Sequence, residues 1–158
     1  MEKKSLWAVG EEISDIRTPA DILNEQAELL EKETKSILRG RILEFSASLI
    51  IGTNTSFFRD TDGKLFGFSL HIVAPRMNNY SYEVLRIAYD PLQIYPVYLK
   101  SDIFHLNSDI FEDVAIICGD EEVFIAKLET TLSSGQIKKV ITNLVAQSKK
   151  SRIFDEAV

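Results

Sequence analysis

Residues 66–89 read FGFSLHIVAPRMNNYSYEVLRIAY, and this stretch decides the fold. Apolar side chains occupy every second position from Phe66 to Ala74, which is the period of a strand with one buried face. Pro75 ends that strand, and the polar residues after it favour a turn before a second run of strand-forming residues, 80–89. A short polar connection of this kind predicts a hairpin and therefore antiparallel pairing.

Two further apolar runs lie on either side of this hairpin in the sequence. Residues 43–51 alternate in the same way, which predicts a strand with Leu43 and Phe45 facing the core and Glu44 facing water. Residues 114–118 form a continuous apolar run, which is typical of a well-buried strand.

A fourth predicted strand, 94–99, contains Pro96. Proline has no N–H to donate to a neighbouring strand, so it predicts a sheet edge or a bulge at this position. A homo-oligomer that pairs through this edge is one arrangement that we consider.

Helical patterns bracket the strands. Thr18 is a good N-cap, and a helix is expected to run from there to about Arg39 and to end at Gly40. Asp120 is expected to cap a second helix, and Ser133 a third that ends near its lysines. The sequence therefore predicts an α+β fold: a mainly antiparallel sheet of four to five strands, with one N-terminal and two C-terminal helices packed on one face.

The chain has 158 residues, which suits a single domain. We place this domain at residues 18–150, between an N-terminal tail (1–17) and a C-terminal tail (151–158), and expect Trp7 to dock onto the domain. A lone cysteine and the lack of a long apolar segment favour a cytoplasmic location without a membrane partner.

Charge is unevenly distributed along the chain. The net charge is −6, and residues 101–135 alone hold eight acidic residues and one lysine. Such an acidic stretch can attract a basic protein partner. The overall negative charge disfavours binding to nucleic acid, although lysines gather near the C-terminus.

Candidate catalytic groups are sparse. His105 lies close in sequence to Asp102, Asp109 and Asp113, a composition that could bind a metal or form a general base. His71 stands alone in a predicted strand, and the sequence lacks close histidine pairs and phosphate-binding glycine loops. No cofactor, metal site or catalytic residue is therefore assigned, and an enzyme is the less favoured class.

Tyrosines gather in the third and fourth predicted strands, and exposed tyrosines are common at docking surfaces. Our hypothesis is a small protein-binding module, with a partner or inhibitor-like role and without catalysis. The alternative is a small-ligand or metal-dependent enzyme that uses His105 and its neighbouring aspartates. The predicted binding residues are Tyr80, Tyr82, Tyr95, Tyr98, Asp102, Asp109, Glu112 and Asp113.

Overall fold

The computed structural model of the chain describes residues 3–8, 16–46, 65–104 and 115–156. In chain order its elements are α1 (Pro19–Glu33), β1 (Arg39–Ser46), β2 (Phe66–Ala74), η4 (Pro75–Met77), β3 (Tyr80–Tyr89), β4 (Val97–Lys100), η5 (Asp102–Phe104), β5 (Ile116–Cys118), α2 (Glu121–Leu132) and α3 (Gly135–Glu156). The elements η4 and η5 are short turns of 3-10 helix.

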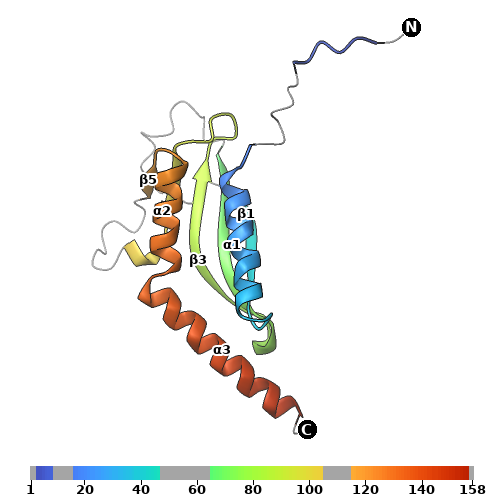
Figure 1. The fold of residues 1–158 in the computed structure, drawn as a ribbon, viewed down its shortest axis with the longest axis vertical. Helices are drawn as coiled ribbons and strands as arrows, with labels where there is room; N and C mark the ends of the chain where they lie inside the picture. The colour runs from blue at the N-terminus through green and yellow to red at the C-terminus, as the bar shows by residue number, and fades with distance from the viewer. Residues whose placement is uncertain (1–2, 9–15, 47–64, 105–114, 157–158) are drawn as a thin grey trace.

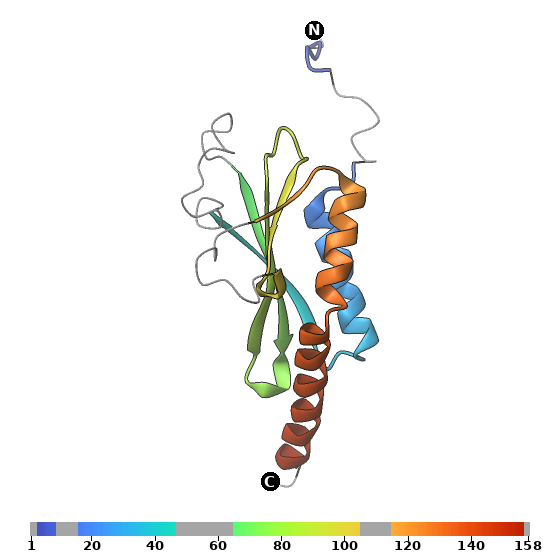
Figure 2. The ribbon, with the colours of Figure 1, turned by 90° about the vertical axis from the view of Figure 1, so that its left-hand side faces the viewer.

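The five strands form one sheet in the order β1-β2-β3-β4-β5, and each runs antiparallel to its neighbour. Figure 1 shows α1 lying over β1, and Figure 2 shows α1, α2 and α3 together on one side of the sheet. α1 contacts β1 and β2, α2 contacts β3 and β5, and α3 contacts β2 and η4. The predicted α+β class, with its antiparallel sheet and its three helices, is confirmed.

The hydrophobic core lies between the helices and the sheet. Leu23 of α1, Ile87 of β3 and Phe124 of α2 are fully buried there. Burying a side chain of this kind is worth about 1.5–3 kcal/mol relative to leaving it exposed. The predicted N-cap of α1 is also confirmed, because Thr18 Oγ1 accepts the Asp21 N–H at 3.1 Å and the Asp21 carboxylate accepts the Thr18 N–H at 2.9 Å.

One extra residue in β3 interrupts the regular alternation of its side chains. Leu70 pairs with Leu85, but His71 pairs with Glu83, so Val84 has no partner of its own in β2. This is a β-bulge. Val84 and Leu85 are consecutive in the sequence, yet both belong to the buried core.

The first helix is shorter than predicted. It ends at Glu33, and the Thr34 hydroxyl then donates to the Leu30 carbonyl at 2.8 Å and accepts the Leu38 N–H at 3.1 Å. Because Thr34 satisfies backbone groups on both sides of it, the chain turns there and brings Leu38 into the core. Gly40, predicted to end the helix, is instead paired within the sheet.

The prediction that Leu43 and Phe45 face the core is wrong, although Glu44 is exposed to water as predicted. A Cβ at Gly40 would lie 2.4 Å from the Ala27 Cα, so Gly40 faces α1 and permits its close approach. Ile42 follows on the same side and packs against the core, while Leu43 and Phe45 face away from the helices. The apolar alternation predicted the wrong buried side because both sides of this strand carry apolar residues. The rest of the predicted strand lies outside the described residues.

The fourth and fifth strands also differ from the predictions. β4 begins at Val97 and pairs with both β3 and β5, so it is not a sheet edge and offers none for an oligomer. Pro96 precedes the strand, where its missing N–H interrupts no ladder. In β5, Ile117 is 46% exposed, so the apolar run is not buried throughout.

The second and third helices begin close to their predicted caps. Asp120 caps α2 as predicted, because its carboxylate accepts the Val123 N–H at 2.9 Å. Ser133 ends α2 rather than starting α3, and its hydroxyl donates to the last turn of α2. Ser134 takes the predicted capping role, since its hydroxyl accepts the Ile137 N–H at 3.3 Å.

The N-terminal segment does not use its tryptophan to dock. Trp7 is 85% exposed, so the prediction that it packs onto the domain is wrong. Among the described residues before α1, Arg17 contacts the domain, immediately before the Thr18 cap.

Candidate docking surface on the open sheet face

The sheet has a side that the helices do not cover, which we call the open face. The strand register places its residues in four rows across the sheet. These rows are Arg39-Val73-Ser81, Arg41-His71-Glu83, Leu43-Ser69-Arg86-Lys100 and Phe45-Gly67-Ala88-Tyr98-Ile117. The contacts of α1, α2 and α3 with the sheet lie on its other side, and Figure 2 shows this face opposite those helices.

Arg86 lies at the centre of the open face. Its guanidinium carbon is 5.3 Å from the centre of the Phe45 ring, and its Nε donates to the Glu83 carboxylate. A cation held over an aromatic face gains electrostatic energy from the ring. A Cβ at Gly67 would lie 2.8 Å from the Phe45 ring, so the glycine leaves room for that ring. Arg86 is therefore held in position by contacts within the chain.

His71 is held by serines on both sides of its ring. Its Nε2 lies 2.8 Å from the Ser69 hydroxyl, and its Nδ1 lies 3.4 Å from the Ser81 hydroxyl. Burial lowers the pKa of His71, with Glu83 opposing this shift and Arg41 adding to it. With both ring nitrogens in contact with serine hydroxyls, His71 is a positioned polar group, and it lies in a strand as predicted.

The open face is cationic in an acidic protein. Its rows carry four cations, Arg39, Arg41, Arg86 and Lys100, and one carboxylate, Glu83. Asp102 borders the same surface, and the whole chain has a net charge of −6. Arg41 is exposed and has no ion pair among the described residues. Exposed apolar atoms lie on the same face, with Leu43 at 37% and Ile117 at 46% exposure. Charge and apolar area together are typical of binding surfaces.

Sequence reasoning missed this cationic group. Arg41, Arg86 and Lys100 come from three strands and are far apart in the sequence. The alternation of Arg39 and Arg41 in the sequence was the pattern that could have indicated cations on one face of a strand. The strand register and the bulge at Val84 are needed to bring the other cations beside them.

The four predicted tyrosines do not form one cluster. Tyr98 lies on the open face, paired with Ala88 and Ile117. Tyr80 and Tyr82 lie at the other end of β3, on the helix side, where the Gln136 side chain of α3 donates to the Tyr82 hydroxyl at 3.2 Å.

Tyr95 lies just before β4, near the start of α2. Burial raises its pKa to about 12, and the neighbouring Glu121 adds to the shift. Its hydroxyl is buried and has no hydrogen bond to the described residues. Tyr95 is therefore packed against the helix side and is separate from Tyr98 on the open face.

Most of the predicted acidic site lies outside the described residues, namely Asp109, Glu112, Asp113 and the neighbouring His105. Asp102 is exposed in η5 and lines a hollow of about 210 Å³ together with Arg86 and Lys100. Within the described ranges no group of three metal-ligating side chains occurs. The enzyme alternative based on His105 therefore stays a prediction.

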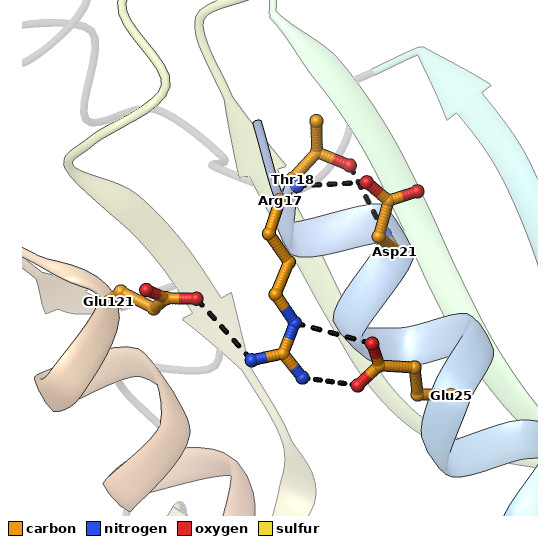
Figure 3. A network of polar contacts seen from close by, with 5 residues as sticks. All are labelled: Arg17, Thr18, Asp21, Glu25 and Glu121. Atoms are coloured by element: carbon orange, nitrogen blue, oxygen red, sulfur yellow. Dashed lines mark hydrogen bonds and ion pairs between the residues drawn. The ribbon is translucent and has the colours of Figure 1, made fainter. Parts of the chain in front are cut away.

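A second polar cluster, the Arg17 junction, lies on the helix side (Figure 3). Arg17 donates to both carboxylate oxygens of Glu25 in α1, and its third nitrogen lies 3.6 Å from Glu121 in α2. Because all three charged side chains come from this chain, the junction ties the segment before α1 to two helices. Its chemistry is satisfied within the fold, so it is a structural contact.

Cys118 ends β5 beside this junction. Burial raises the pKa of its thiol to about 11, with Lys127 opposing the shift and Asp120 adding to it. Nucleophilic cysteines need a depressed pKa and access to solvent. Cys118 is fully buried and remains protonated at neutral pH, as expected for a core residue.

Comparisons of the chain with protein-family models, curated proteins and solved structures give no match. None of the helices in the described ranges is both long and apolar enough to span a membrane.

Proposed function

We propose that this chain is a small protein-binding module without catalytic activity, and that a partner protein docks on the open face. The observation that carries the proposal is the cationic group of Arg41, Arg86 and Lys100, set among apolar residues on the side opposite the helices. Arginines next to aromatic rings are frequent among the residues that dominate binding energy.

The preorganisation of Arg86 supports docking. Its contacts with Phe45 and Glu83 hold a long side chain in one place, so less conformational entropy is lost when a partner binds. Arg41 supplies a charge whose partner is not found within the described part of the chain. A partner of complementary charge would therefore gain an ion pair with Arg41.

The state of the reactive side chains supports a non-catalytic role. The Cys118 thiol is buried and protonated, and His71 is engaged by Ser69 and Ser81. The thiol lacks the lowered pKa and the solvent access of a nucleophile, and both ring nitrogens of His71 already have partners within the chain.

The acidic stretch offers a second docking surface, for a basic partner, as the sequence predicts. Asp102 is its one binding residue within the described ranges, and Arg86 and Lys100 border the same hollow. These cations offset the charge of Asp102, so the open face is the better supported surface.

The proposal is tested by capture and cross-linking from the native host. The wild type and two charge-reversed baits, Arg41→Glu and Lys138→Glu, are compared at low salt, since Lys138 is exposed on α3 and gives the same change in charge. We expect partners that Arg41→Glu loses and Lys138→Glu keeps, with cross-links that map to the open face.

Equal recovery by both variants, or cross-links confined to the helix side, would contradict docking on the open face. A partner lost on mutation of Asp102→Lys, but kept by Arg41→Glu, would favour the acidic surface instead.

A further inference from the structure

The first strand is a free edge of the sheet in the described part of the chain. β1 runs over eight residues, Arg39–Ser46, and its described pairing is with β2 alone. The opposite edge, β5, has three residues. An edge strand presents backbone N–H and C=O groups that can pair with another strand. Because β1 is longer than β5, it is the edge that can accept an additional strand.

The side chains of β1 would determine which kind of strand can pair with it. Arg41, Leu43 and Phe45 face the open side, whereas Ile42 and Glu44 face the helix side. In an antiparallel pair, directly opposed residues lie on the same side, and opposite charges across the pair stabilise it. A strand with a carboxylate opposite Arg41, and apolar side chains near Leu43, would match both the charge and the apolar surface.

We propose that β1 binds an acidic, extended segment of a partner protein as a sixth strand, with the segment's carboxylates facing Arg41 on the open face. The inference rests on the proposed function and names the chemistry of the partner. Backbone pairing supplies affinity in this mode of recognition, and alternate side chains supply specificity.

A second copy of the chain fits this edge less well. Self-pairing centred on Arg41 would place like charges directly opposite each other, which is destabilising. Pairing centred on Leu43 would bring Arg41 against Phe45 of the other copy, and Arg86 already covers that ring.

Single-stranded nucleic acid also fits less well. Such binding uses exposed aromatic rings on which bases stack. On the open face Phe45 lies under the Arg86 guanidinium, and Tyr98 is half-buried. The chain's net charge of −6 would also repel a polyphosphate.

The test is a selection of random dodecapeptides displayed on phage against the folded full-length chain, with peptides that also bind Arg41→Glu removed. We expect the enriched sequences to carry Asp or Glu at every second position. The best peptide is then measured by fluorescence anisotropy. Arg41→Glu should weaken it on the order of tenfold, Arg41→Lys less, and Lys138→Glu hardly at all.

Strand addition is distinguished from simple ion pairing by N-methylation of the peptide backbone. Methyl groups on one alternating set of amides would block pairing with β1, and methyl groups on the other set would point away from it. We expect loss of binding for one set alone. Circular dichroism of Arg41→Glu confirms folding, and Arg41→Gln replaces it if that variant unfolds.

Four results would overturn the inference: no enrichment over Arg41→Glu, enrichment of basic peptides, tolerance of methylation in both sets, or displacement of the peptide by oligothymidylate. A dimer in light scattering that competes with the peptide would assign the edge to a second copy. If capture still depends on Arg41 while strand addition fails, the proposed docking function stands and its sixth strand does not.

Discussion

On the helix-covered side of the sheet, Arg17 meets Glu25 and Glu121, whereas on the open side Arg41 meets no carboxylate among the described residues. Both arginines are exposed to solvent. The first has its counter-charges within the chain and connects parts of it. The second has no counter-charge among the described residues, and the docking proposal rests on it. Such a cation is therefore a better starting point for a search for partners than an ion-pair cluster whose charges are already met within the described chain.

The largest effect is expected from a change on the covered side of β1. Gly40→Ala would place a Cβ 2.4 Å from the Ala27 Cα, so α1 must move away from the sheet. Overpacking of this kind costs about 1–3 kcal/mol in the free energy of unfolding, measured by urea denaturation. Gly119→Ala is the control, because an added Cβ there meets nothing within 4 Å. Equal midpoints for both variants would show that the close approach is unimportant.

The second prediction concerns the open face, where a substitution should change the binding affinity but not the stability. Arg41→Gln removes the charge but keeps most of the side chain, so binding of a selected acidic peptide should weaken severalfold. The free energy of unfolding should change by less than about 0.5 kcal/mol, as is usual for exposed positions. Anisotropy and urea denaturation measure the two quantities. If Arg41→Gln bound the peptide normally but unfolded at a lower urea concentration, Arg41 would contribute to stability rather than to binding.

Arg17→Gln is the matched change on the covered side. It removes the contacts with Glu25 and Glu121, so the melting temperature should fall slightly while peptide affinity stays the same. The side chains are largely exposed, so the difference should vanish near 1 M salt, where the screening length is about 3 Å. A loss that persists at high salt would mean that packing, rather than charge, holds the junction.

The smallest effect concerns pH. Because the pKa of His71 is lowered in the folded chain, the unfolded chain binds more protons just below its ordinary pKa of 6.5. Stability is therefore full above about pH 6.5 and falls as the pH drops toward the folded-state value. His71→Gln should flatten this slope in thermal melts between pH 7 and 5, relative to His105→Gln. Parallel slopes for the wild type and His71→Gln would contradict the assignment.

The hairpin and the layer order could be predicted from the sequence because they depend on local patterns. The alternation in 66–74, the break at Pro75 and the caps at Thr18 and Asp120 each act within a few residues. The end of α1 could not be predicted in this way. Helical spacing continued past Glu33, and the competing signal was a hydroxyl contact from Thr34 to Leu38, which needs the folded turn.

The candidate site was less predictable for a similar reason. Tyr98 was singled out and lies on the open face, but the cations around it come from strands distant in sequence. Leu43 and Phe45 were expected in the core because apolar alternation predicts burial. On this strand Gly40 and Ile42 hold the buried side, since the smallest residue is needed against Ala27.

The extra residue in β3 shifts the alternation that places successive side chains on opposite sides of the sheet. Glu83 and Arg86 are three residues apart, a spacing that in a regular strand would send them to opposite sides, yet they form an ion pair on one. If Val84 were instead paired in a regular ladder, either Glu83 or Arg86 would have to turn to the helix side. Deletion of Val84 would leave Glu83 and Arg86 two residues apart and still on one side, so the bulge adds a buried side chain to the core without changing the chemistry of the open face.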